Sequence, residues 1–405
     1  MQIKSWRTII IAGAACLFVL YGAWWGKMIS NATERSGTDF IAFYTAGRVA
    51  KADGFSAIYD IQKQHEVEQA VVGFRLADEQ VLLYNHMPFV VPLLTVIVND
   101  NYVASFSRWA LILVLVYIFS SYFIVNTLFD HETAMQRFVL FLSIISFLPI
   151  FISVWQGQDT AFLYLGAVLW GVGLIRKNEW LIALGLTLMT VRPHISIALA
   201  LPLLFKQIRA WWKGVALISG VALASVLMIR MQGTVELLNL LRISAEGVWY
   251  GMKPAAMFNL LGMLLRIIPF PSPAFETLVG WSIYFVGLGL IMLLWRRSST
   301  TSGSLLALTL LIALLTVPHL HFHDLALLVL TLLFIVHEHL ATDSDPRWLA
   351  LPLVTSFFLV AGILMPPLYF ILPYCLYALI IWLLFRHSSL SFIPSPRKEK
   401  ALRKS

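Results

Sequence analysis

The chain has 405 residues, of which 59% are hydrophobic and only 12% are charged, and its mean hydropathy is +0.81. Soluble domains carry about 25% charged residues, so this composition excludes an ordinary soluble protein and predicts an integral membrane protein. The net charge of +8 does not indicate nucleic-acid binding. The basic residues gather at the ends of apolar segments and in the C-terminal tail, where the positive-inside rule and anionic lipids account for them.

Apolar segments in chain order predict an all-α polytopic membrane protein with about 10–12 transmembrane helices. The predicted spans are residues 8–26, 105–128, 138–154, 158–175, 180–191, 194–208, 212–231, 274–295, 303–318, 322–338, 347–365 and 367–386. Short basic connections, such as Arg176-Lys177 and Arg296-Arg297, place both termini in the cytoplasm. Segments 180–191 and 194–208 are short for a span, which predicts tilted or broken helices there.

The first long non-cytoplasmic loop, residues 27–104, holds most of the soluble-looking sequence. It predicts a helix that begins near Phe40, a turn at Asp53-Gly54 and a polar helix from Ile61 to Val72. The apolar stretch from Met87 to Val98 is too short to span, so we expect it to lie in the interface or to enter the membrane as a half-hairpin.

The second long non-cytoplasmic loop, residues 232–273, mixes apolar and charged residues with prolines and predicts interfacial helices. Residues 387–405 form a basic cytoplasmic tail. Residues 1–405 contain no repeat and no separate soluble domain, so we expect a single domain. Cys16 and Cys375 lie in apolar segments and are expected to pack there rather than form a disulfide.

The polar residues near the predicted spans fall on the non-cytoplasmic side. Ionisable groups at membrane depth are costly and are usually functional, so this one-sidedness predicts a single cavity at the outer leaflet. The candidate substrate-binding residues are Tyr44, Tyr59, Asp60, Asn85, His86, Gln156, Gln158, Arg192, His194, His319, His321, His323 and Asp324, with Tyr84 and Asp159 beside them and Asp39 as the candidate catalytic residue.

Asp39 allows two interpretations that do not exclude each other. It could cap the helix that follows, as aspartates often do. It could also be a general base at the lipid surface. Arg192 interrupts an apolar run next to Pro193, which breaks the helix. It either binds a lipid phosphate through two parallel hydrogen bonds or is a snorkelling arginine at a segment end.

Two further motifs have competing interpretations. In H-L-H-F-H-D, His319 and His323 would share a helical face as metal ligands with Asp324, but no familiar zinc spacing is present. Hydrogen bonding to a phosphate or sugar is the favoured role, and a structural role for one or two histidines is the alternative. Gln156 to Asp159, Q-G-Q-D, is either a polar hairpin turn or a sugar-binding turn.

The motifs, taken in order, resemble glycosyltransferase family 87, the polyprenol-phosphate-mannose-dependent mannosyltransferases with the GT-C membrane fold. They are D-F-x-x-F-Y-x-A-G-R (39–48), G-F-S-A-I-Y-D (54–60), Y-N-H-M-P-F (84–89), Q-G-Q (156–158), R-P-H (192–194) and H-F-H-D (321–324). The sequence departs from the family in lacking paired prolines at 84–89 and in having arginine at 192, where many members have lysine.

The resemblance implies that a hexose, with mannose expected, moves with inversion from a polyprenyl-phosphate donor to a glycolipid or glycan acceptor. Asp39 would be the base, Arg192 would hold the departing phosphate, and His321 or His323 would bind that phosphate or the acceptor. No metal or other cofactor is implied. The implied location is the bacterial plasma membrane, in contact with its lipids. Asp60 stays open as an alternative base.

Three other functions compete with this interpretation of the sequence. A transporter or flippase of a lipid-linked sugar would also need a phosphate-binding cavity, but transporters usually show internal repeats and polar residues toward both faces. A lipid-linked oligosaccharide ligase or another GT-C branch, with a metal, would share the fold and the one-sided polar cluster. A scaffold without activity would leave the one-sidedness unexplained.

Overall fold

The computed structural model describes residues 3–245, 253–343 and 345–387, and these residues form helices and connecting turns without any β-strand. Within these described residues, six helices are long and apolar enough to cross a membrane, or seven if one bent pair is a single span. The protein is therefore an all-α, multi-pass integral membrane protein, as the composition predicts.

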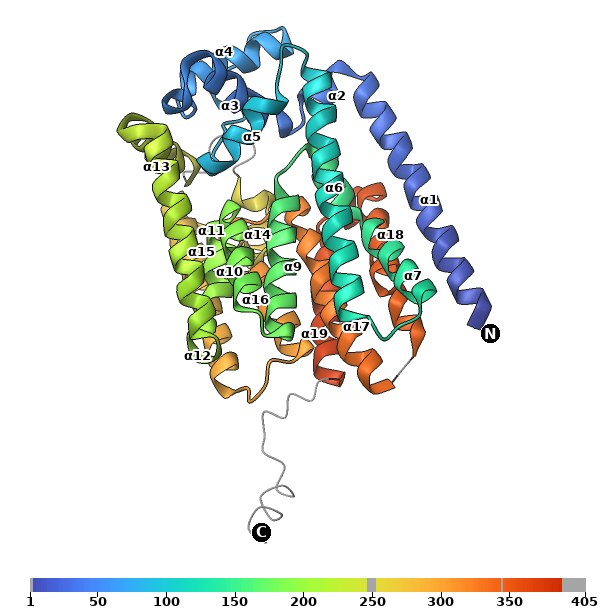
Figure 1. Cartoon of the computed structure of the whole chain (residues 1–405). Helices are drawn as coiled ribbons and strands as arrows, with labels where there is room; N and C mark the ends of the chain where they lie inside the picture. The colour runs from blue at the N-terminus through green and yellow to red at the C-terminus, as the bar shows by residue number, and fades with distance from the viewer. Residues whose placement is uncertain (1–2, 246–252, 344, 388–405) are drawn as a thin grey trace.

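The helices that are long and apolar enough to span a membrane are the long elements in Figure 1. Two of them follow directly on short 3₁₀ turns. They are α1 (Ile3–Ser30), α6 (Tyr102–Leu128), α13 (Ile208–Ala245), α15 (Pro273–Arg297), α17 (Leu328–Asp343, after the turn Phe322–Leu327) and α18 (Leu351–Leu364, after the turn Pro346–Ala350).

The bent pair and the shorter apolar helices fill the space between the long helices. They are α7 (Ala134–Ile145), α8 (Leu148–Gln156), α9 (Thr160–Arg176), α10 (Glu179–Leu188), α11 (Pro193–Ala200), α12 (Leu203–Lys206), α16 (Gly303–Thr316) and α19 (Ile371–His387). Helices α7 and α8 meet at 49°, where Pro149 cannot continue the helical hydrogen bonds. Breaks before Pro193 and at Pro202 confirm the broken helices predicted for 180–208.

A layer of short helices, which we call the cap, covers the upper end of the bundle in Figure 1. It consists of α2 (Ala32–Ser36), α3 (Phe40–Asp53), α4 (Ile61–Val72), α5 (Val91–Ile97) and the turns Phe55–Ala57, Asp78–Gln80 and Pro88–Val90. The bounds of α4 match the prediction. Within 87–98, Leu94 is buried against α3 and Val96 is exposed, so this stretch forms part of the cap, and its insertion into a lipid interface stays a prediction.

Helix α13 bends where the second predicted loop begins. The predicted span ends at residue 231, next to Arg230, whose φ of 60° marks a kink between two helical parts of α13. The part beyond the kink is helical up to Ala245, and α14 (Leu260–Ile267) and the turn Pro254–Ala256 follow, so helices are found in this loop as predicted. Their position in a lipid interface stays a prediction. Residues 246–252 of this loop, and the basic tail beyond residue 387, lie outside the described residues.

Helix α1 begins, and α19 ends, at the end of the bundle opposite the cap (Figure 1). This places both ends of the described chain on one side, as predicted, while the identity of that side stays a prediction. Cys16 and Cys375 are free, as expected, but both are exposed on the outer faces of their helices rather than packed.

Candidate functional site

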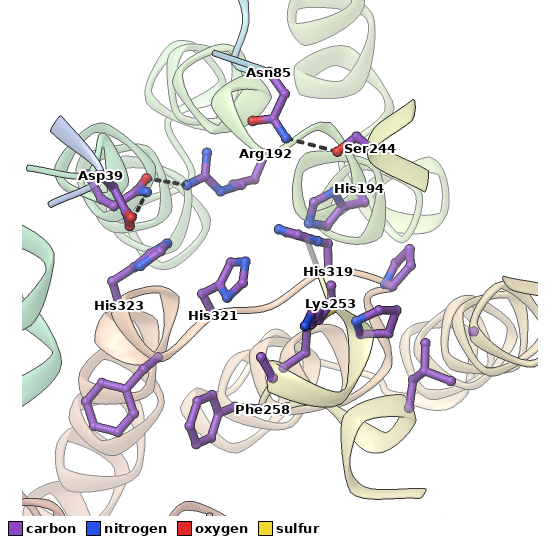
Figure 2. Close-up of a pocket in the computed structure, with 18 of the residues that line it drawn as sticks. Asp39, Asn85, Arg192, His194, Ser244, Lys253, Phe258, His319, His321 and His323 are labelled. Atoms are coloured by element: carbon purple, nitrogen blue, oxygen red, sulfur yellow. Dashed lines mark hydrogen bonds between the residues drawn. The ribbon is translucent and has the colours of Figure 1, made fainter. Parts of the chain in front are cut away.

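A cavity of about 770 Å³ lies between the cap and the upper ends of the membrane helices. Its walls come from helix ends and helix breaks far apart in the sequence: the start of α3, the α8–α9 turn, the α10–α11 break, the end of α13, the start of α15 and the segment before α17. Such breaks are tolerated at membrane depth where they line a polar cavity. Most of the polar clusters of the sequence thus meet at one place (Figure 2).

Asp39 lines the cavity at the first turn of α3. Its side chain makes no capping hydrogen bond, so the capping interpretation of Asp39 is wrong. Asp39 Oδ2 instead accepts a 2.7 Å hydrogen bond from Gln158 Nε2 (Figure 2). The carboxylate is therefore turned toward the α8–α9 turn and away from the backbone of its own helix.

Arg192 lies at the α10–α11 break and is only 8% exposed. Its Nη2 donates to Gln158 Oε1 at 3.2 Å, and its Nη1 lies 3.0 Å from Asp159 Oδ1. Its Nε lies 3.5 Å from Asp324 Oδ1. One guanidinium thus stands between two buried carboxylates, which compensates a charge that would otherwise be very costly to bury. The snorkelling alternative for Arg192 is therefore wrong, because the side chain is buried.

Asp159 belongs to the Q-G-Q-D motif but was not among the predicted binding residues. It is fully buried, and its Oδ2 lies 3.1 Å from His86 Nδ1. The guanidinium of Arg192 and the imidazole of His86 both contact this carboxylate and compensate the cost of burying its charge. Asp159 is therefore the ionised partner of Arg192, a pairing across 33 positions of sequence that no local motif indicates.

Asp324 and His323 form the other side of this polar cluster. Asp324 is buried behind the cavity wall, where Oδ1 accepts from Thr160 Oγ1 at 3.1 Å and Oδ2 accepts from the backbone N–H of His321 at 3.2 Å. His323 Nδ1 lies 3.0 Å from Gln156 Oε1, so this nitrogen carries the hydrogen. Asp324 thus supports the site and does not line the cavity.

His194, His319 and His321 line the cavity opposite Asp39 (Figure 2). Residues 317–321 are not helical, so His319 and His323 do not share a helical face as the metal interpretation requires. Among the residues that the structure describes, no group of three or more His, Cys, Asp or Glu side chains has the arrangement of a metal site. Burial lowers the pKa of His319 well below its ordinary value, which makes it a neutral donor or acceptor.

Besides Asp324, three predicted site residues lie outside the cavity lining. Tyr44 donates to the carbonyl of Asn99 at 2.8 Å, and Tyr59 donates to the carbonyl of His86 at 2.7 Å. Asp60 caps α4 by accepting from the backbone N–H of Lys63 at 3.2 Å. These residues hold the cap together, and Asp60 is a structural cap rather than an alternative base. Their local sequence patterns, Y-x-x-x-R and Y-D before a helix, do not distinguish a residue that supports the cap from one that lines the cavity.

The cavity also contains groups that were not predicted. Lys253 is a cation on the cavity wall. Ser244 is another such residue, and it accepts a 3.0 Å hydrogen bond from the predicted Asn85, which connects the 82–87 segment to α13. Apolar side chains such as Phe258 and Trp281 line the part of the cavity away from Asp39 (Figure 2 shows Phe258). Glu276, in the first turn of α15, is a second carboxylate on the cavity wall.

The site can therefore offer carboxylates, neutral imidazoles and the cations of Arg192 and Lys253 to a polar group, and an aromatic surface to an apolar one. Comparison of the sequence with protein-family models and with curated proteins finds no match. The resemblance to glycosyltransferase family 87 accordingly stays a prediction that rests on the sequence motifs.

Proposed function

We propose that the protein is a membrane glycosyltransferase. It moves a hexose, mannose by the family resemblance, from a polyprenyl-phosphate donor to the hydroxyl of a glycolipid or glycan, with inversion, at the non-cytoplasmic face of a bacterial plasma membrane. One observation carries this proposal: a carboxylate, Asp39, lines a cavity that is polar around it and aromatic farther away, at one end of a membrane bundle. A lipid-borne sugar has the same two-part chemistry.

In the proposed reaction, Asp39 accepts the proton of the acceptor hydroxyl while the acceptor oxygen forms a bond to the anomeric carbon. The bond from that carbon to the phosphate oxygen breaks, and the polyprenyl phosphate leaves with the electron pair. Attack and departure on opposite faces of the sugar invert the anomeric configuration. The acceptor hydroxyl must then lie between Asp39 and the anomeric carbon.

The departing phosphate needs donors that compensate its growing charge. The guanidinium of Arg192 is already surrounded by Asp159, Asp324 and Gln158, which argues against the two parallel hydrogen bonds to phosphate expected from the sequence. Lys253 lines the cavity near His319 and His321 (Figure 2). In this proposal Lys253 supplies the charge and the imidazoles supply N–H donors.

The test is sugar transfer from a radiolabelled polyprenyl-phosphate hexose by the purified protein in liposomes, with and without EDTA. Asp39→Asn should lower the transfer rate by about 10²–10⁴-fold, the usual contribution of a general base, and should still bind the donor. Asp60→Asn is the matched control, because Asp60 caps α4 outside the cavity, and it should keep the rate.

Other outcomes point elsewhere. If Asp39→Asn keeps the rate while Glu276→Gln loses it, Glu276 is the base. Loss of transfer in EDTA would indicate a metal-dependent reaction. If the wild-type protein binds labelled lipid and moves it across the bilayer without transferring sugar, it is a transporter or flippase and the proposal is wrong.

A further inference from the structure

We infer that Gln158 and Arg192 are positioning residues for Asp39: Arg192 orients the amide of Gln158, and that amide holds one oxygen of the Asp39 carboxylate. This inference rests on the proposed function, because it assigns Asp39 a reactive role. It replaces the idea, drawn from the sequence, that both side chains touch the substrate first.

The chemistry of the three groups permits only one arrangement. A guanidinium can only donate hydrogen bonds and a carboxylate can only accept them, whereas an amide can do both. Gln158 Oε1 accepts from Arg192 at 3.2 Å, and Gln158 Nε2 donates to Asp39 at 2.7 Å. The orientation of the amide is therefore determined by its two neighbours, and the Asp39 oxygen is held in turn.

The Arg192 end of this series of hydrogen bonds is itself held by several contacts. Its guanidinium donates to the carbonyl of Val191 at 3.1 Å and lies beside the buried Asp159 and Asp324 carboxylates. Asp324 is fixed by Thr160 at the start of α9. Side chains and backbone from three separate helix breaks thus contact one guanidinium. A residue that only binds a mobile ligand would not require so many fixed contacts.

The Asp39 end is held by backbone packing. A Cβ atom on Gly157 would lie 2.6 Å from Cβ of Phe40, so the α8–α9 turn sits directly against the first turn of α3. Trp109 Nε1 donates to the carbonyl of Gly157 at 2.7 Å and secures the turn from the other side. The backbone positions of Gln158 and Asp39 are therefore fixed relative to each other.

An amide between the two charges has a chemical consequence. A carboxylate paired directly with a guanidinium is held strongly in its ionised form and is a weak base. A neutral amide orients the carboxylate without a direct ion pair. Gln158 thus prevents a direct ion pair between Asp39 and Arg192 while it holds the two side chains in a fixed arrangement.

The test uses Gln158→Leu and Gln158→Glu in the liposome transfer assay, with Gln156→Leu as the matched control. Gln156 lies on the same turn but contacts His323 instead of Asp39. Gln158→Leu should lower kcat by about 100-fold, the effect expected of a small misplacement of a reacting group, with little change in the donor KM. In the Asp39→Asn background, Gln158→Leu should have no further effect, whereas Gln156→Leu should have the same effect in both backgrounds.

Gln158→Glu keeps the shape of the side chain and its contact with Arg192, so it guards against misfolding of the leucine variant. It removes the donor to Asp39 and places two carboxyl groups together, which then share a proton at lower pH. Its rate relative to wild type should rise as the pH falls, because the shared proton restores the hydrogen bond. A side chain with only a structural role would leave the pH profile unchanged.

Additive effects of Gln158→Leu and Asp39→Asn, a raised donor KM with unchanged kcat, or a wild-type pH profile for Gln158→Glu would each overturn the inference while leaving the transferase function intact. Absence of transfer by the wild-type protein would overturn the proposed function, and this inference with it.

Discussion

Glu68 is a carboxyl group that the cap buries on the inner face of α4, where it is only 2% exposed. Its Oε2 accepts from the backbone N–H of Leu82 at 3.0 Å, while its Oε1 has no hydrogen-bond partner among the described residues. Burial raises the pKa of Glu68 to about 8. At neutral pH the folded protein therefore holds this carboxyl mainly in its protonated form.

Glu68 should make the stability of the cap depend on pH. The folded-state pKa is raised above the value of about 4.3 in an unfolded chain, so the folded state binds the extra proton between these two values. The free energy of unfolding should fall as the pH rises from about 4.5 to about 8, by a few kcal/mol. Glu68→Gln keeps the acceptor for Leu82 and should flatten this profile in thermal unfolding measured across that range. A parallel profile in the variant would contradict the assignment.

Arg192 provides a second prediction at the residue scale. Arg192→Met would leave Asp159 and Asp324 buried without their guanidinium, which typically costs about 3–5 kcal/mol. The control is Arg347→Met, because Arg347 pairs with Asp345 at the surface, where such pairs contribute about 0–1 kcal/mol. Denaturant unfolding in detergent micelles should separate the two variants clearly. Equal midpoints would show that the Arg192 pairs do not stabilise the fold.

At the scale of elements, the turn between α8 and α9 connects packing to the site. Gly157 has a φ of +73°, which disfavours any other residue, and its missing side chain is what lets Phe40 approach. Gly157→Ala should lower the free energy of unfolding in two ways. The steric overlap with Phe40 costs about 1–3 kcal/mol, and the left-handed backbone conformation costs alanine about 1 kcal/mol more. We expect both a lower unfolding temperature and a loss of transfer, because Phe40 is the neighbour of Asp39.

Gly73 is the matched control for this prediction. It ends α4 with a φ of +76°, and a Cβ atom there would meet nothing within 4 Å. Gly73→Ala should therefore carry only the backbone cost and keep the transfer rate. If both variants lose stability equally and keep activity, the contact between the turn and α3 does not position the site.

The elements also show what the sequence could predict. The polar helix predicted for Ile61 to Val72 is present as α4, although the structure and not the sequence analysis identified Asp60 as its cap. The predicted end of the span at residue 231 lies next to the kink at Arg230, and the chain beyond it is helical up to Ala245, as predicted for this loop. In contrast, the capping pattern at Asp39 failed because its partner, Gln158, lies 119 positions away.

For the whole molecule, the sequence predicted the gathering of the polar clusters at one end better than their roles. Motifs separated by an even number of crossings lie at the same end of the bundle, even when helix boundaries shift by several residues. Which side chains then face the cavity depends on tertiary contacts, so Tyr44, Tyr59 and Asp60 were assigned to the site although they support the cap. The pairing of Asp159 with Arg192 was missed for the same reason.

The side of the membrane on which the cavity lies can be tested through α15. This helix runs from Pro273 at the cavity to Arg297. Its length of about 37 Å exceeds the thickness of a hydrocarbon core, which is about 30 Å. Replacing the exposed Cys16 and Cys375 by serine gives a background without reactive thiols. In that background, Glu66→Cys on the cap and Arg297→Cys should react differently with a membrane-impermeant maleimide. In intact cells only Glu66→Cys should be labelled, and both should be labelled after permeabilisation.

Each other outcome has a distinct meaning for the molecule. Labelling of Arg297→Cys alone would place the cavity on the cytoplasmic side, where a donor flipped to the outer leaflet could not reach Asp39. Labelling of both in intact cells would mean that α15 does not cross the bilayer. The expected pattern, joined to loss of transfer in Asp39→Asn, would put the reacting carboxylate on the face where a lipid-borne sugar and an acceptor from outside can meet.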